Sequence, residues 1–98
     1  MGDLPFVRDP AKAAANQRKH GVSFREAQSI FAGDNALFLA DPNHSAGEER
    51  YLRLGLSVRL RILTVVHTVE DDGDTIRIIS AGKATKREQQ LYLERVMG

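Results

Sequence analysis

Cysteine is absent from this sequence, which excludes disulfide bonds and metal sites built on thiolates. No stretch approaches the roughly 18 consecutive apolar residues of a membrane-spanning helix, and the first residues lack the apolar core of a signal peptide. We therefore expect a protein that works in the cytoplasm and makes no contact with a membrane.

Motifs for the common cofactors are also missing. The eight glycines are scattered and form neither a phosphate-binding loop nor a dinucleotide-binding fingerprint. The three histidines are too dispersed to indicate a metal site, and no nucleophile-elbow sequence is present. We expect neither a bound metal nor a cofactor.

The chain has the length and composition of one small globular domain. Its 98 residues are 42% hydrophobic and 28% charged, which excludes a long disordered chain. We expect a single domain over residues 1–98. Because so short a chain buries only about two thirds of its unfolded surface, a partner or a second copy would add stability.

The charge is nearly balanced, since 14 Lys and Arg residues face 13 Asp and Glu residues for a net charge of +1. That total predicts nothing about nucleic acid, but the charges are segregated, and the pattern is compatible with a basic face or with ordinary solvated surface. The basic residues form three groups: Arg18, Lys19, His20 and Arg25; Arg50, Arg53, Arg59 and Arg61; and Lys83, Lys86, Arg87 and Arg95.

Helical signals stand at both ends of the chain. Asp9 is a favourable N-cap before a proline, and an alanine-rich helix is predicted over residues 11–19, ending at Gly21. A Ser-x-x-Glu capping box predicts a second helix after Ser23. Thr85 opens a third helix with the same capping spacing.

Strand signals fill the middle of the chain and one short segment at residues 6–7. Residues 52–58 alternate between apolar and polar, and residues 62–69 are β-branched and nearly all apolar, as in a central strand. Two further strands are predicted over residues 36–39 and 75–81. The predicted order is β-α-α-β-β-β-β-α, an α+β fold in which N-terminal helices and a C-terminal helix pack on a curved antiparallel sheet.

One register prediction bears on function. If residues 70–74 form a five-residue hairpin loop, Val69 pairs with Thr75, and His67 then lies opposite Arg77. A slip of one residue would remove this pairing.

The remaining polar residues could cleave a phosphodiester. Cleavage of RNA through its 2′-hydroxyl needs a base, a cation for the phosphate and an acid for the departing oxygen. Arginine suits the phosphate, and histidine suits proton transfer near neutral pH. Glu49 and Arg50 precede the first long strand, His67 and Arg77 lie on later strands, and Lys83 follows the last one.

Each candidate also has a structural interpretation. His67 could be a core histidine, and Arg77 could pair with a loop carboxylate such as Asp74. Cations such as Lys19 and His20 are favoured at a helix C-terminus, and Tyr92 could belong to the core. From chemistry alone, the sequence indicates a small α+β domain that binds an acidic partner.

Several segments together resemble the BrnT family, the toxin half of a bacterial type II toxin–antitoxin pair. The similarity extends from about Phe6 to Tyr92. The segments that carry it are Asp9-Pro-Ala-Lys12 with Asn16, Lys19-His-Gly-Val-Ser-Phe24 with Glu26-Ala27, Phe31-Ala32, Glu48-Glu49-Arg50, Val65-Val-His67-Thr68, Arg77-Ile-Ile-Ser-Ala81, Lys83-Ala-Thr85, Glu88 and Tyr92.

The resemblance implies a RelE-like fold and a metal-independent endoribonuclease that arrests growth by cleaving RNA. It also implies a neutralising antitoxin similar to BrnA, which carries a DNA-binding domain and represses its own operon. The toxin would then belong to a dimeric toxin–antitoxin assembly that binds operator DNA through the antitoxin.

Residue roles follow from the same resemblance. Arg50 and Arg77 would bind the phosphate, Lys83 would stabilise transition-state charge, and either Glu49 or His67 would act as base or acid. A second set is expected to contact RNA: Lys12, Lys19, His20, Arg53, Lys86, Arg87 and Tyr92.

The chain departs from the family pattern at two places. Phe6-Val7-Arg8-Asp9 stands where the family usually has Phe-Glu-Trp-Asp, and Gly82 replaces the arginine of the usual Ser-Ala-Arg-Lys-Ala. Loss of a guanidinium beside a phosphate site weakens transition-state stabilisation, so this chain is expected to be an attenuated or inactive toxin.

Two function classes therefore remain open, with a plain structural domain as a third. The first is a ribonuclease toxin, active or attenuated. The second is a catalytically inactive module that binds the antitoxin and modulates operon repression. RNA fragments with 2′,3′-cyclic phosphate ends, formed in EDTA, would indicate the first class.

Overall fold

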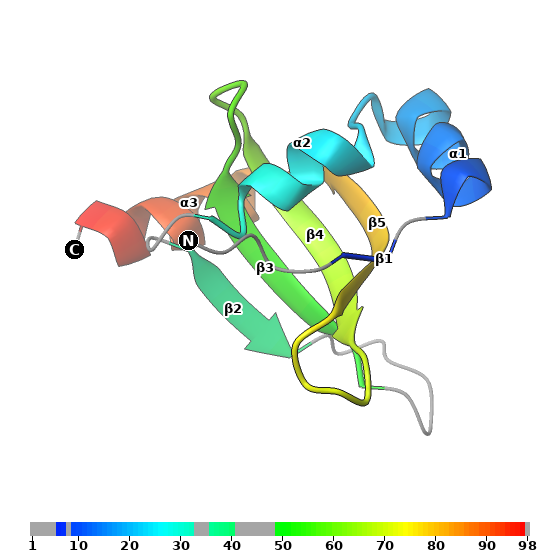
Figure 1. Cartoon of the computed structure of the whole chain (residues 1–98). Coiled ribbons are helices and arrows are strands. Elements are labelled where there is room, and N and C mark those ends of the chain that lie inside the picture. The colour runs from blue at the N-terminus through cyan, green and yellow to red at the C-terminus, as the bar shows by residue number, and fades with distance from the viewer. Residues whose placement is uncertain (1–5, 8, 33–35, 41–48, 98) are drawn as a thin grey trace.

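The computed structural model describes residues 6–7, 9–32, 36–40 and 49–97 (Figure 1). The helices and strands follow the predicted order β-α-α-β-β-β-β-α. Two residues named in the comparison with the family pattern lie outside the described residues. They are Arg8, in the segment that departs from the pattern, and Glu48, in a segment that matches it. The elements are β1 (Phe6–Val7), α1 (Pro10–His20), α2 (Phe24–Ser29), β2 (Leu37–Ala40), β3 (Tyr51–Leu56), β4 (Ile62–Val69), β5 (Ile76–Lys83) and α3 (Lys86–Met97).

The five strands form one curved sheet in the order β1-β5-β4-β3-β2 (Figure 1). Strands β2 to β5 pair antiparallel, as predicted, whereas β1 joins the edge of β5 in parallel. The sheet is therefore mixed. Helix α2 crosses one face, and α3 lies behind the other (Figure 1).

The main core lies between α2 and the sheet. Because side chains alternate along a strand, Leu63 and Val65 of β4 face α2, where they meet Phe24 and Ala27. At Gly55 a Cβ atom would lie 2.9 Å from Cβ of Ile30, so glycine is needed for the helix to approach this closely.

Helix α1 begins and ends as the sequence predicts. The Asp9 side chain accepts hydrogen bonds from the backbone N–H groups of Ala11 and Lys12, and Gly21 closes the helix at a φ of 70°. The buried Asn16 side chain donates to the Val22 and Ala81 carbonyls at 2.9 and 2.8 Å and accepts from the Ala81 N–H. This amide fixes α1 against β5.

Helix α3 has the reciprocal capping box that was predicted at its start. The Thr85 N–H donates to the Glu88 carboxylate at 2.8 Å, and the Glu88 N–H donates to the Thr85 hydroxyl at 3.1 Å. The same carboxylate accepts a hydrogen bond from Thr64 of β4. Since Thr64 alternates with the core residues, α3 packs on the face opposite α2.

The predicted register between β4 and β5 is wrong by one residue. Val69 pairs with Ile76, and Thr68 rather than His67 lies opposite Arg77. The loop is one residue longer than expected, because Asp72 accepts hydrogen bonds from the N–H groups of Asp74 and Thr75 and so includes Thr75 in the turn. A bulge follows at Val66/His67.

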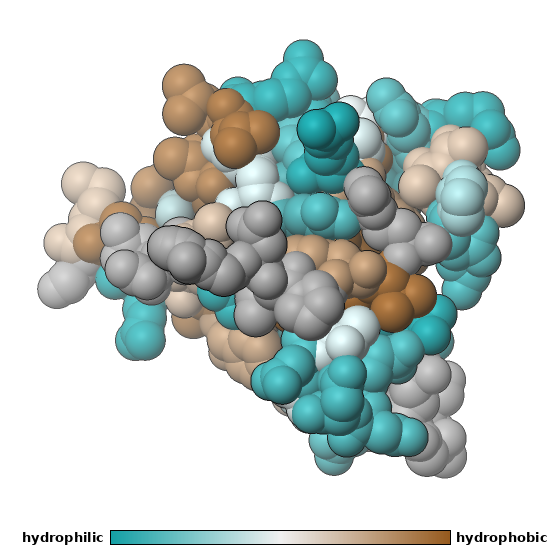
Figure 2. Space-filling model, viewed as in Figure 1, coloured by the Kyte–Doolittle hydropathy of each residue, from teal (hydrophilic) through white to brown (hydrophobic). Residues whose placement is uncertain are grey.

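Exposed apolar side chains gather at the hairpin between β3 and β4, whereas polar residues cover the opposite end of the sheet around the β4–β5 loop (Figure 2). Val58 and Leu60 at the hairpin are 75% and 79% exposed. The two ends of the sheet thus present different chemistry.

Candidate functional site

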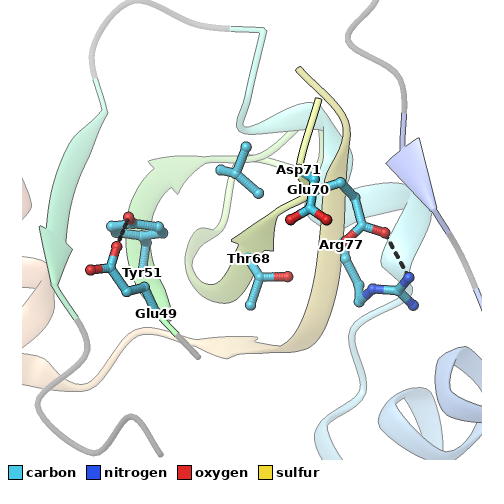
Figure 3. Close-up of a pocket in the computed structure, with 7 residues that line it drawn as sticks. Glu49, Tyr51, Thr68, Glu70, Asp71 and Arg77 are labelled. Atoms are coloured by element: carbon cyan, nitrogen blue, oxygen red, sulfur yellow. Dashed lines mark hydrogen bonds and ion pairs between the residues drawn. The ribbon is translucent and has the colours of Figure 1, made fainter. Parts of the chain in front are cut away.

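A pocket of about 320 Å³ opens at the polar end of the sheet, where β3 begins, β4 ends and β5 begins. Its walls carry three carboxylates, one guanidinium and two hydroxyl groups (Figure 3). The lining residues are Glu49, Tyr51, Thr68, Val69, Glu70, Asp71 and Arg77. Two of the predicted catalytic residues, Glu49 and Arg77, therefore share one pocket.

Glu49 lies on one side of Thr68 and is oriented by Tyr51 (Figure 3). The Tyr51 hydroxyl donates a hydrogen bond to the Glu49 carboxylate at 2.9 Å. This bond raises the pKa of Tyr51, because loss of its proton would place two negative charges side by side. At neutral pH the pocket thus holds a protonated phenol that fixes an exposed carboxylate.

Arg77 lies on the other side of Thr68, in an ion pair with Glu70 (Figure 3). The closest nitrogen and oxygen are 2.7 Å apart, and the two side chains are 43% and 33% exposed. The sequence-based alternative of a loop carboxylate is confirmed in kind, but the partner is Glu70 rather than Asp74. An ion pair this exposed contributes little stability, so an incoming anion can compete for the guanidinium.

His67 lies on the opposite face of the sheet from Arg77, because it pairs with Ile78 while Thr68 pairs with Arg77. Its side chain is buried to 1% exposure and packs edge-on against Phe31, with ring centroids 5.0 Å apart. Burial lowers the pKa of His67 to about 4, and the positive charge of Arg53 acts in the same direction. The imidazole is therefore neutral at physiological pH.

Two further arginines, Arg50 and Arg53, are less open than their charge suggests. Arg50, which follows Glu49 in the sequence, is half-buried. The Arg53 guanidinium lies over the Phe31 ring, 4.9 Å from its centroid, and burial lowers the pKa of Arg53. Arg50 directly precedes β3, and Arg53 lies within it.

Lys83 lies away from the pocket. It is six residues beyond Arg77 on β5, a distance of about 20 Å at roughly 3.3 Å per residue. Its neighbour Gly82 faces His20, because a Cβ atom at Gly82 would lie 3.7 Å from Nδ1 of that ring. The structure thus places the predicted cations at two separate positions, the pocket and the contact between α1 and β5.

The residues predicted to bind RNA are distributed over both faces. Lys12, Lys19 and His20 are exposed on α1, and Lys86 and Arg87 are exposed on α3, behind the sheet. Tyr92 is buried at 6% exposure, in agreement with the alternative that it belongs to the core.

The sequence analysis missed Tyr51, Thr68, Glu70 and Asp71 as pocket residues. Tyr51 had a usable signal, because residues two apart in an extended strand share a face, and Tyr51 is two residues after Glu49. The positions of Glu70 and Asp71 depend on the six-residue loop and had no such signal.

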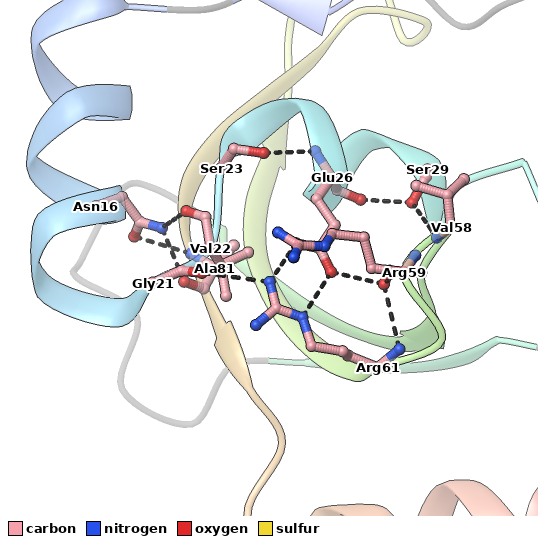
Figure 4. Close-up of polar contacts among 11 residues, drawn as sticks. Asn16, Gly21, Val22, Ser23, Glu26, Ser29, Val58, Arg59, Arg61 and Ala81 are labelled. Carbon is pink, nitrogen blue, oxygen red and sulfur yellow. Dashed lines mark hydrogen bonds and ion pairs between the residues drawn. The ribbon is translucent and has the colours of Figure 1, made fainter.

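A second polar group joins α2 to the β3–β4 hairpin and does not reach the pocket (Figure 4). The buried Glu26 carboxylate forms an ion pair with Arg61 and accepts a hydrogen bond from Ser57 at 2.6 Å. These bonds lower the pKa of Glu26 and raise that of Arg61. Glu26 was predicted as a capping residue. Its N–H donates a hydrogen bond to the Ser23 hydroxyl as predicted, but its carboxylate binds Ser57 and Arg61 of the hairpin.

The described residues contain no group of three or more side chains suited to hold a metal ion. Within the same part of the chain, no helix has the length and apolar character needed to cross a membrane.

The fold and the sequence both have known relatives. The crystal structure of the Brucella abortus ribonuclease toxin BrnT is similar, with a TM-score of 0.59 at 20% sequence identity. The similarity covers 85% of this chain and 96% of that one, which shows a shared fold. No curated protein sequence matches significantly.

Residues 9–88 match the family model described as the ribonuclease toxin, BrnT, of type II toxin–antitoxin systems. This match spans most of the chain and includes every element from α1 to β5. The chain belongs to the BrnT family of ribonuclease toxins.

Proposed function

We propose that the chain is a metal-independent endoribonuclease that arrests growth by cleaving RNA at the pocket between β3, β4 and β5. A RelE-like fold and neutralisation by a BrnA-like antitoxin, in a dimeric assembly that binds operator DNA, belong to the same proposal. The observation that carries it is the pocket itself, where a carboxylate fixed by Tyr51 faces the Arg77 guanidinium across Thr68.

Glu49 is the base in this proposal. It is exposed, and the Tyr51 hydroxyl holds its carboxylate in one orientation, as a general base requires. His67 is neutral, buried and turned to the other face, so we assign it a positioning role: its ring lies 5.8 Å from that of Tyr51 and supports it.

Arg77 is the phosphate ligand, with Arg50 as its second cation. The planar guanidinium of Arg77 can exchange the Glu70 carboxylate for a phosphate and keep two charge-assisted hydrogen bonds. Lys83, about 20 Å from Arg77 along β5, and His20 of α1, which lies beside Gly82, would then bind the RNA backbone at a separate point.

Substitutions in the pocket test this assignment. Glu49→Gln should lower kcat for cleavage of a short RNA by at least about 100-fold, because general-base catalysis contributes this much. The matched control is Glu94→Gln on the exposed surface of α3, which makes the same chemical change outside the pocket. Equal cleavage by both variants would remove Glu49 from the site.

The ion pair between Arg77 and Glu70 supplies a test in which activity should rise rather than fall. Glu70→Gln should raise kcat/KM several-fold at low salt, because it frees Arg77 for the phosphate. Asp71→Asn removes one negative charge from the same pocket and controls for the general change in potential. If both variants gain equally, the gain comes from the general change in potential and not from release of Arg77 by Glu70.

A further inference from the structure

Aromatic side chains gather beside the pocket on the face of the sheet that carries α2. The Phe38 and Tyr51 rings have centroids 5.1 Å apart and an interplanar angle of 32°. The buried His67 ring lies next to both, at 5.7 Å from Phe38 and 5.8 Å from Tyr51. Phe38 itself is 50% exposed, which is unusual for so large an apolar ring inside a cluster.

Strand register explains why these residues share a face. Phe38 of β2 pairs with Arg53 of β3, and Tyr51 of β3 pairs with His67 of β4. Residues 51 and 53 lie on the same side of their strand because they are two apart. Phe31, which follows α2, covers His67 and Arg53 from above, while Phe38 keeps its exposed surface.

Two polar atoms within this cluster lack a partner. In the part of the chain that the structure describes, neither Nε of Arg53 nor Nδ1 of His67 has a hydrogen-bond partner, although both atoms are buried. A cation beside half-exposed aromatic rings is the combination that binds single-stranded nucleic acid, where bases stack on rings and phosphates approach the charge.

We propose that Phe38, supported by Tyr51, is a stacking surface for an unpaired RNA base next to the scissile phosphate, with Arg53 as the neighbouring cation. This inference rests on the proposed function, because it names how the same pocket holds its substrate. The link is Tyr51, whose ring contacts Phe38 and whose hydroxyl binds Glu49. Stacking depends on the base's π face, so the surface accepts all four bases.

The test uses the full chain and a short oligonucleotide whose 2′-oxygens are all methylated and which carries one 2-aminopurine. Such a ligand cannot be cleaved through its 2′-oxygen, so binding is measured independently of catalysis. Wild-type protein should bind it and quench the fluorescence of the stacked base. Phe38→Ala should weaken binding about tenfold and remove the quenching, while Phe38→Trp should restore both.

Leu39→Ala is the matched control, since Leu39 lies on the same strand, is 36% exposed and points to the other face. Thermal unfolding of each variant identifies any loss of folding, and Phe38→Trp keeps the test valid if Phe38→Ala is unstable. Unchanged affinity and quenching in a folded Phe38→Ala variant would overturn the proposal. So would an unchanged affinity for RNA combined with loss of self-association or antitoxin binding, which would make this strand a protein-docking edge.

The two proposals fail separately. If ordinary RNA is cleaved but Phe38→Ala binds the methylated ligand as wild type does, only the stacking surface is wrong. If wild-type protein binds and quenches the methylated ligand, Phe38→Ala does neither, and wild-type protein cleaves no RNA, the stacking surface stands and the nuclease proposal is wrong.

Discussion

His67 is the residue whose surroundings change its chemistry most. On a strand rich in β-branched residues, a histidine can be a core residue or a proton carrier, and its sequence neighbours do not decide between them. In the structure it is 1% exposed, and burial lowers its pKa to about 4. The three-dimensional packing of Phe31, Phe38 and Tyr51 around the ring sets this value.

The lowered pKa predicts how stability depends on pH. The unfolded chain binds a proton at His67 below its ordinary pKa of 6.5, whereas the folded chain does not until about 4. The free energy of unfolding should therefore be highest, as far as His67 contributes to it, above pH 6.5. It should fall by up to about 3 kcal/mol as the pH drops to 4.

Urea unfolding at several pH values measures this dependence. His67→Leu should lack this part of the pH dependence between 6.5 and 4, whereas the exposed control His20→Leu should keep it. The same slope in the His67→Leu variant and in wild type would show that another group is responsible.

Gly82 tests which of the two basic positions supports catalysis. Its φ is not left-handed, and a Cβ atom there would make ordinary contacts of 3.7 and 3.8 Å with His20, so the backbone accepts a side chain at this position. Gly82→Arg should raise kcat/KM and toxicity. Because Gly82 is about 16 Å from Arg77 along β5, the gain should be a lower KM.

The control for this change is Gly82→Met, which adds a side chain of similar reach without charge. A gain confined to kcat would contradict the pocket assignment and move the chemistry to the contact between α1 and β5. No change at all would remove the argument that this chain is attenuated by its glycine.

At the scale of the elements, local signals in the sequence predicted the helix caps but not the strand register. The Asp9 cap, the Gly21 stop and the Thr85–Glu88 capping box were all predicted and are confirmed, because each depends on residues within one turn. The β4–β5 register was not predicted correctly, because the length of the turn depends on hydrogen bonds of the Asp72 side chain that composition does not reveal.

The attachment of α2 to the β3–β4 hairpin predicts a second effect on stability. Glu26→Gln removes the charge that Arg61 pairs with and should lower the free energy of unfolding at pH 7 by about 2 kcal/mol. Because the pKa of Glu26 is lowered in the folded state, its stabilisation is present above the unfolded value near 4.5 and is lost as the pH falls through the folded pKa.

Denaturant unfolding of the variant and wild type at pH 7 and pH 3 measures both parts. The difference between them should be smaller at pH 3 than at pH 7. Glu94→Gln on α3 should differ little from wild type at either pH, and a difference as large as that of Glu26→Gln would show that burial of the ion pair does not matter.

At the scale of the whole molecule, fold class and family could be predicted from the sequence, and the match over residues 9–88 confirms the family. The grouping of the candidate residues could not. The length of β5 puts Arg77 and Lys83 far apart, and the one-residue register shift puts His67 on the opposite face of the sheet from Arg77. Both depend on strand pairing rather than on residue type.

End-group analysis of RNA incubated with the purified chain in EDTA tests the central claim most directly. The account predicts fragments with 2′,3′-cyclic phosphate ends from wild-type protein and almost none from Glu49→Gln. Intact RNA with the folded wild-type chain would contradict it and favour a module that binds the antitoxin without catalysis.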